Sequence, residues 1–349
     1  MAKILPGSKI KRVTPKQIFM TALHRGKTPR PATGSATSVV TTDLMEKSRI
    51  FFPEAHLSPE LMAELAALGH EKLGFDNIMP LFSVCHESAA LGCQVDWGDR
   101  YSMPSCRGKI ANIEDDIKVR EDFLQQPECQ IPLKALNLLR KRYGNQVAIV
   151  GKVFGPWTLG YHIFGVQEFL IATLLNPAAV HQAINRLKLV TIRFAQAQIE
   201  AGADALCLAD HATKDLCCPH AYQEFLQPVH QEFQEKLSCP LILHICGDTA
   251  DRIPAISQTK IACFHFDSAV PADQARRLAG EKLALMGGTS NLNVIRKGSP
   301  EKIWDDVKEK LAAGIDIIGP ECAVPLDSPS ENLQFLASSV RLLRREKPG

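Results

Sequence analysis

Short apolar runs that favour β-structure alternate with helical patterns along this chain, and this alternation restricts its fold more than any other feature. Several of the runs are apolar throughout, as strands buried on both faces usually are. The last five follow one another at intervals of roughly 20 to 35 residues, the length of a strand, a helix and two loops. The predicted strands are Thr37–Thr41, Lys72–Asn77, Gln146–Val150, Ala205–Ala209, Pro240–His244, Ala262–Asp267, Leu283–Gly288 and Ile315–Gly319.

Helix starts are marked by a capping residue followed by proline at the first helical position, where the missing N–H of proline costs nothing. Thr14-Pro15 and Ser328-Pro329 also carry Gln or Glu at the capping-box position. Simpler versions of this signal occur at Ser58-Pro59, Asn176-Pro177 and Ser299-Pro300, and amphipathic helices are predicted over Ala179–Ala201 and Glu331–Leu343.

Eight strands alternating with helices favour a single (β/α)8 barrel, an α/β TIM barrel that takes residues 1–349 as one domain. Residues 1–13 are expected to form an N-terminal extension. A doubly wound sheet is the competing fold, but no glycine-rich phosphate loop follows an early strand.

The range 81–145 is too long for a plain unit of one strand and one helix. We expect it to be an inserted cap region after the second strand, covering the mouth of the barrel. Within it, Gln94–Asp99 resembles a short hairpin, and helical segments are predicted around Ile113–Gln125 and Leu133–Tyr143.

Composition restricts the partners and the compartment. The chain has 40 basic and 38 acidic residues, interspersed, so its charge of +2 gives no reason to expect a nucleic acid or a membrane surface as partner. Its 11 cysteines show no disulfide rhythm, and the N-terminal lysines precede no apolar signal-peptide core. The most apolar stretch, 147–166, is interrupted by Lys152, Gly155, Pro156 and His162, so no membrane span is expected. These features favour a reducing cytoplasm.

Polar residues at the carboxyl ends of the predicted strands are the candidates for function, because barrel active sites lie at that end. Most of them are candidates for binding substrate, although a polar residue at a strand end is equally well explained as structural. These candidate substrate-binding residues are Asn77, Asp210, His211, Asp267 and Glu321.

Three further strand-end residues form a candidate metal site. His244 and Cys246 close one strand and lie on the same side of it, because side chains alternate along an extended segment. Cys322 follows the last strand, and the separation from Cys246, 322 − 246 = 76 residues, equals three units of about 25 residues. Two thiolates and one imidazole suit Zn²⁺ and leave a fourth position open, as in catalytic sites.

The charge of this donor set indicates the chemistry. Zn²⁺ with two thiolates and a neutral imidazole has no net charge, so it activates water weakly but favours the thiolate form of a substrate thiol. Alkyl transfer to sulfur is therefore expected. Two alternatives remain: the cysteines are merely packed at strand ends, or Cys85-His86 with Cys93 forms a rival metal set inside the inserted region.

Four segments carry a resemblance to a known family: Thr14–Phe19, Gly74–Asn77, Leu243–Asp248 and Gly319–Leu326. Together they resemble the corrinoid-dependent thiol methyltransferases of the uroporphyrinogen decarboxylase superfamily. Within it, the chain is similar to the methylcobalamin:coenzyme M methyltransferases of methanogens, of the methanol-pathway type. The likeness extends from about Thr14 to Leu343.

The resemblance implies a barrel with one Zn²⁺ held by His244, Cys246 and Cys322. Coenzyme M would be the methyl acceptor, and methylcobalamin, a co-substrate presented by a separate corrinoid carrier protein, would be the donor. The alternatives are methyl transfer to another thiol or another acceptor, a non-catalytic module that binds the carrier, and porphyrinogen decarboxylation. The decarboxylases carry an arginine-rich N-terminal segment, whereas 28–35 here contains one arginine.

The sequence does not distinguish the cation that would bind the sulfonate of coenzyme M. Lys152, Lys214 and His211 are equal candidates by position.

Overall fold

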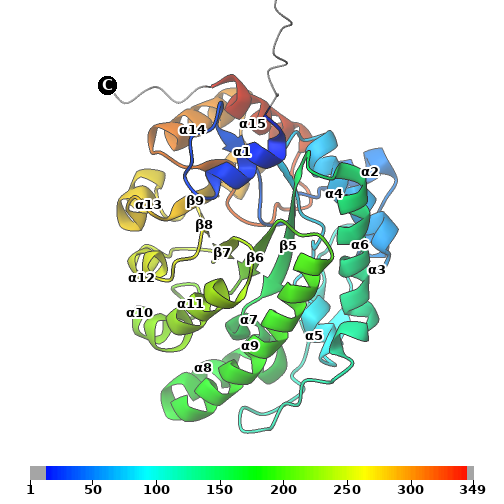
Figure 1. Ribbon diagram of the computed structural model, residues 1–349, viewed down its shortest axis with the longest axis vertical. Coiled ribbons are helices and arrows are strands. Elements are labelled where there is room, and N and C mark those ends of the chain that lie inside the picture. Colours follow the sequence, from blue (N-terminus) through cyan, green and yellow to red (C-terminus); the bar gives the residue numbers. More distant parts are fainter. Residues whose placement is uncertain (1–12, 344–349) are drawn as a thin grey trace, which may run out of the picture.

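Eight parallel strands curl into a nearly closed barrel in the computed structural model, which describes residues 13–343, and helices surround it (Figure 1). The order of the strands is β1-β10-β9-β8-β7-β6-β5-β2. The predicted TIM barrel is thereby confirmed, whereas the predicted extension 1–13 lies outside the described residues apart from Val13. The barrel strands are β1 (Ala32–Thr33), β2 (Asn77–Ile78), β5 (Ala148–Phe154), β6 (Ala205–Ala209), β7 (Leu241–His244), β8 (Cys263–Phe266), β9 (Ala284–Thr289) and β10 (Ile317–Pro320).

Helices connect successive barrel strands and pack their apolar faces on the sheet. The α-helices are α1 (Pro15–Ala22), α2 (Thr42–Ser48), α3 (Glu54–Leu57), α4 (Pro59–Glu71), α5 (His86–Ala90), α6 (Pro127–Tyr143), α7 (Pro156–Phe164), α8 (Val166–Leu175), α9 (Pro177–Glu200), α10 (Pro219–Ala221), α11 (Gln227–Lys236), α12 (Ile253–Gln258), α13 (Ala272–Ala279), α14 (Pro300–Ala312) and α15 (Ser330–Leu342). A 3₁₀ turn, Phe123–Gln125, and two π-helical turns, Tyr222–Leu226 and Asn291–Arg296, complete the helical segments.

The barrel closes between β1 and β2 largely through side chains. The backbone N–H of Asp76 donates to the carbonyl of Thr33 (2.8 Å), and the Asp76 carboxylate accepts the Thr33 N–H (3.0 Å). One residue further, the Asn77 amide accepts from the N–H of Ser35 (3.0 Å) and donates to its carbonyl (2.8 Å). The strand order places β1 and β2 at its two ends, without a backbone ladder between them. The side chain of Asn77 makes the two bonds that a peptide group would make in such a ladder.

The first two predicted strands are placed differently in the structure. Thr37–Thr41 is not a strand, because hydroxyl groups bind the backbone there: Ser35 Oγ donates to the Thr37 carbonyl (3.0 Å). The strand precedes this loop, as β1. Of Lys72–Asn77 only Asn77 is extended, because Gly74 adopts φ +86° in the turn that follows α4.

Most predicted helix starts are confirmed. Thr14 and Gln17 form the capping box of α1, and Ser58, Asn176 and Ser299 cap α4, α9 and α14. The last helix differs: α15 begins at Ser330 rather than after Ser328, because the carboxylate of Asp43 accepts hydrogen bonds from both the N–H (3.0 Å) and the hydroxyl (2.6 Å) of Ser330.

The range 81–145 contains α5, the antiparallel hairpin of β3 (Gln94–Asp96) and β4 (Ser105–Arg107), and α6. Helix α6 packs against α4, α9 and β5, as a helix of the outer ring does (Figure 1). Of the described residues 113–125, only Phe123–Gln125 is helical, as a 3₁₀ turn, so the helix predicted there is wrong for the rest of that range. Arg193 of α9 donates to the carbonyls of Arg120 and Glu121, which a helix would use internally.

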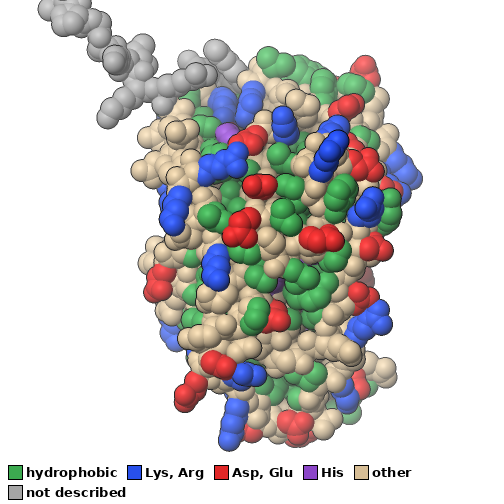
Figure 2. All heavy atoms as spheres, turned by 90° about the vertical axis from the view of Figure 1, so that its right-hand side faces the viewer, with side chains coloured by type: hydrophobic (Ala, Val, Ile, Leu, Met, Phe, Trp, Pro, Cys, Tyr) green, Lys and Arg blue, Asp and Glu red, His purple; other side chains and the backbone are tan. Residues whose placement is uncertain are grey.

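Acidic and basic side chains are interspersed on the face that carries α4 and α6 (Figure 2). Among the described residues, no single helix has the length and apolar composition needed to cross a membrane. The pair α7 and α8 passes that test together by length and composition, with a bend of 112° between the two helices.

Candidate functional site

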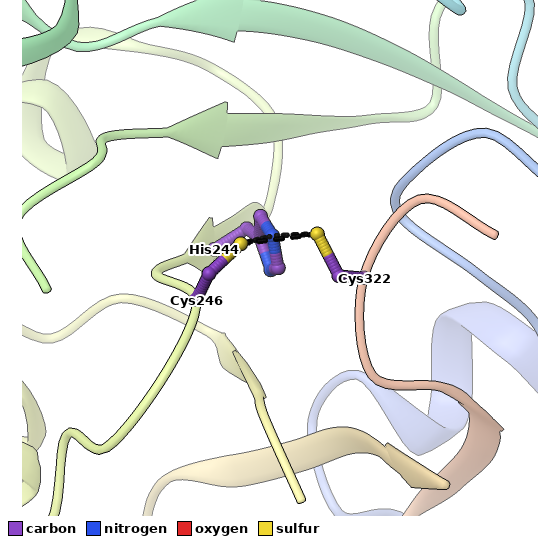
Figure 3. A group of neighbouring side chains, drawn as sticks. All are labelled: His244, Cys246 and Cys322. Carbon is purple, nitrogen blue, oxygen red and sulfur yellow. Dashed lines mark hydrogen bonds between the residues drawn. The ribbon is translucent and has the colours of Figure 1, made fainter. Parts of the chain in front are cut away.

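His244, Cys246 and Cys322 meet at the carboxyl end of the barrel (Figure 3). His244 Nε2 lies 3.1 Å from the Cys246 sulfur and 3.3 Å from the Cys322 sulfur, and the two sulfurs are 3.0 Å apart. In the described part of the chain, this is the one group of three or more His, Cys, Asp or Glu residues whose ligand atoms gather closely enough for a metal ion.

The local backbone places the first two of these side chains. His244 ends β7, and alternation turns Ile245 into the apolar core while Cys246 faces the same side as His244. Gly247 then adopts φ +75°, a conformation that favours glycine, and its N–H donates to the carboxylate of Asp267 (2.9 Å). The turn that carries Cys246 is therefore fixed to the end of β8.

His265 on β8 connects the two sides of the site, and sequence reasoning missed it. Its backbone carbonyl is paired with His244 Nδ1 (3.3 Å), and its Nε2 is paired with the carbonyl of Pro320 (2.8 Å), two residues before Cys322. When His244 Nδ1 donates to this carbonyl, Nε2 is left free to bind a metal. The one available signal was its place on a predicted strand, two residues before Asp267.

The donor set fits Zn²⁺. Ligand distances of about 2.0–2.3 Å around a tetrahedral ion correspond to ligand atoms about 3.5–3.8 Å apart, so a small outward movement of the side chains accommodates the ion. The hydrogen bond from Cys246, with the neighbouring His244, lowers the pKa of the Cys322 thiol well below its usual range. A thiolate is therefore favoured at this position, and thiolate is the form that binds metal.

A cavity of about 350 Å³ opens beside the trio. Aromatic and aliphatic side chains form much of its wall, including Phe82, Val84, Met103 and Pro104 from the range 81–145. Its polar lining residues are Thr37, Lys152, Thr158, Asp210, His211, His244, Cys246 and Cys322. Most of the surface of the cavity is nevertheless apolar, and a largely apolar surface with a few placed polar groups is common in small-molecule sites.

Asp210 and His211, both predicted as candidates, line this cavity at the end of β6. The Asp210 carboxylate is buried and already engaged, since it accepts from the N–H of Thr158 (2.9 Å) and is paired with His230 Nε2 (3.1 Å). The imidazole of His211 packs edge-on against Tyr161, and burial lowers the pKa of His211. Of the two, His211 has the side chain with no hydrogen bond to the described residues.

The remaining candidates, Asn77, Asp267 and Glu321, support the framework and do not line the cavity. Asn77 closes the β1–β2 seam, and Asp267 holds the turn after Cys246. Glu321 accepts from the N–H groups of Ser268 (3.0 Å) and Asn291 (2.7 Å), and burial raises the pKa of its carboxyl group. Its two bonds tie the segment before Cys322 to the neighbouring loops.

The rival set of Cys85, His86 and Cys93 is not gathered around one point. His86 is directed at the carbonyl of His56 (3.2 Å), and the Cys93 thiol is directed at the carbonyl of His162 (3.6 Å). Cys85 and Cys93 are buried free cysteines.

The chain is similar to known proteins over most of its length. Residues 14–343 match the family described as uroporphyrinogen decarboxylase (URO-D). The chain is 30% identical to a methylated-thiol–coenzyme M methyltransferase of Methanosarcina mazei, over 93% of this chain and 88% of that protein. It is 28% identical to the methylcobamide:CoM methyltransferase MtaA of Methanosarcina barkeri, over 93% of this chain and 97% of that protein.

The fold is shared with a solved methyltransferase structure from Methanosarcina mazei, with a TM-score of 0.91 and 28% identity. The match covers 94% of this chain and 98% of that one. The family match spans nearly all of the described barrel, from the cap of α1 to the end of α15. This chain is a member of the uroporphyrinogen decarboxylase family.

Proposed function

We propose that this protein transfers a methyl group from a methylated corrinoid to the thiol of coenzyme M, using Zn²⁺ held by His244, Cys246 and Cys322. The observation that carries the proposal is the meeting of one imidazole and two thiols at the wall of a mostly apolar cavity. The relatives named as coenzyme M methyltransferases support the choice of reaction.

The donor set supports the choice of a thiol as the acceptor. With two thiolates and a neutral imidazole, a bound Zn²⁺ would lower the pKa of a substrate thiol in the open position and keep the resulting thiolate nucleophilic. The residues of the chain hold this arrangement: His265 directs His244, while Asp267 and Glu321 fix the segments that carry Cys246 and Cys322.

The transfer itself is a displacement at carbon. The thiol proton leaves to solvent, the thiolate sulfur attacks the methyl carbon, and a C–S bond forms as the Co–C bond breaks. The bonding electron pair stays on cobalt, which becomes Co(I). The apolar wall of Phe82, Val84 and Met103 supports this step, because a charged nucleophile is more reactive when water is excluded.

The size of the cavity supports a carrier protein as the partner. A space of about 350 Å³ suits a short thiol, whereas a corrinoid macrocycle is far larger. The corrinoid must therefore meet the thiol at the mouth of the barrel, and a carrier protein that docks there would present its methyl group.

The position of Arg30 disfavours porphyrinogen decarboxylation. Its guanidinium is bound to the carboxylate of Asp76 (2.8 Å), which precedes β2 and so lies at the amino end of the barrel. Lys152 is the one lysine or arginine among the residues that line the cavity. A substrate with several carboxylates would find one lysine and no arginine there.

The proposal is tested with Cys322→Ala. We expect the variant to lose bound zinc and most of its demethylation of methylcobalamin by coenzyme M, because two protein ligands hold the ion poorly. Cys239→Ala is the matched control, since Cys239 is also a free cysteine but lies before β7, at the opposite end of that strand. Full zinc occupancy and undiminished activity in Cys322→Ala would contradict the proposed function.

A further inference from the structure

Lys152 is a buried lysine in the wall of the cavity. It lies on β5, and its side chain faces the interior together with that of Phe154, two residues further along the strand. The backbone of Lys152 is fixed by Gln198, which accepts from its N–H (2.9 Å) and donates to its carbonyl (2.8 Å). The backbone at this position is therefore fixed, and 3% of the residue is exposed.

The ammonium group is poorly satisfied by the protein. Of its three donors, one is directed at the carbonyl of Phe82 at 3.4 Å, near the limit of a hydrogen bond. Burial lowers the pKa of Lys152, and part of this effect is offset by the nearby Cys207, Glu87 and Cys322. No carboxylate among the described residues lies within the 4.0 Å of an ion pair, and the ammonium group lies 5.5 Å from the centre of the Phe154 ring. A buried ammonium group with no carboxylate in ion-pair range is costly, so an anion bound in the cavity would stabilise it.

The other two candidate cations are placed differently. Lys214 is 57% exposed and is already paired with Asp248 (2.9 Å). It does not line the cavity. His211 does line it. Burial lowers the pKa of both His211 and Lys152, and because that of His211 starts from an ordinary value of 6.5 against 10.5 for Lys152, His211 is the weaker cation of the two.

We infer that Lys152 is the anchor for a negatively charged group on the thiol substrate, so that the site takes a short thiol bearing a sulfonate or a carboxylate. This inference rests on the proposed function for the thiol end of the ligand. The acidic group on the ligand is inferred from the cavity alone. Lys152 lies in the same wall as His244, Cys246 and Cys322, so the ammonium group could bind one end of a small molecule whose other end reaches these three residues. Specificity follows, because a neutral thiol leaves Lys152 uncompensated.

The test is Lys152→Met, which keeps the length and shape of the side chain and removes its charge. Calorimetry on the zinc-loaded protein would measure binding of coenzyme M, 3-mercaptopropionate, neutral 2-mercaptoethanol and ethanesulfonate, which has no thiol. We expect affinity for one or both acidic thiols to fall about 10- to 100-fold, the usual value of a charge-assisted hydrogen bond. Ethanesulfonate binding should disappear if the sulfonate is the favoured acid, and 2-mercaptoethanol should bind as before.

Lys214→Met is the matched control, and its affinities should not change. Unaltered binding of both acidic thiols by Lys152→Met would overturn the inference, as would an equal loss of acidic and neutral thiols, which indicates a general disruption of the site. Thermal unfolding verifies that Lys152→Met is folded. If the wild type methylates no thiol but still binds an acidic ligand through Lys152, the proposed function fails while the anion site stands.

Discussion

Replacing Glu87 with glutamine should stabilise the protein at alkaline pH and have little effect in acid. Glu87 lies on α5 with no exposed surface, and one carboxylate oxygen accepts the N–H of Phe154 (2.9 Å) while the other has no partner among the described residues. Burial raises the pKa of this carboxyl group from 4.5 to about 7. Glutamine keeps the acceptor for Phe154 and does not ionise.

The sign and size follow from proton linkage. Below pH 4.5 the group is protonated in the folded and unfolded states alike, so its stabilising contribution is complete. As the pH rises through about 7, the unfolded chain ionises first and the folded protein loses up to about 3 kcal/mol. The stability advantage of Glu87→Gln over the wild type should therefore grow by about 2–3 kcal/mol between pH 5 and pH 8.

Urea unfolding followed by fluorescence at several pH values measures this difference. Glu64→Gln, at an exposed position of α4, is the matched control and should show no such trend. The reasoning is refuted if the separation between the Glu87→Gln and wild-type unfolding midpoints is the same at pH 5 and pH 8.

Two further predictions concern the framework of the site. His265→Phe should lower zinc affinity about 10- to 100-fold in a chelator competition, because the hydrogen bond that orients Pro320 before Cys322 is lost; exposed His220→Phe should leave it unchanged. Gly319→Ala should lower the midpoint of thermal unfolding far more than Gly314→Ala. A Cβ at 319 on β10 collides with the carbonyl of Gly34, which follows the neighbouring strand β1, whereas 314 has open space and only its φ of +79° to strain. Equal shifts for the two glycine variants would contradict the packing argument.

The meeting of His244, Cys246 and Cys322 was predictable because parallel topology does most of the positioning. Once His244 and Cys322 are assigned to strand ends of one barrel, the fold brings both to the same mouth whatever lies between them in sequence. The same logic placed Asp210 and His211 beside the cavity. The sequence did not distinguish these two residues from Asn77. A polar residue at a strand end has the same sequence pattern whether its side chain faces the cavity or, like that of Asn77, bonds a neighbouring strand.

Long-range side-chain bonds account for the errors. The first barrel strand has two residues, and no long apolar run in the sequence marks it. The side chains of Asp76 and Asn77 make the bonds to the backbone of this segment that a longer neighbouring strand would make. Asp43 sets the start of α15 from far along the chain. Arg193 takes carbonyl groups that a helix over 113–125 would need. In each case the deciding partner is distant in sequence, and no local pattern reveals it.

The three residues of the proposed metal site lie at the ends of two strands that are not neighbours, and this constrains how the site forms. In the sheet, β8 and β9 separate β7, which carries His244, from β10, which precedes Cys322. His265 on β8 bonds to both sides, so the spacing of the ligands depends on that strand being in register. A complete donor set therefore requires the assembled sheet from β7 to β10. Metal binding should consequently stabilise that half of the barrel as a unit, because the ion binds the folded arrangement and not the separate strands.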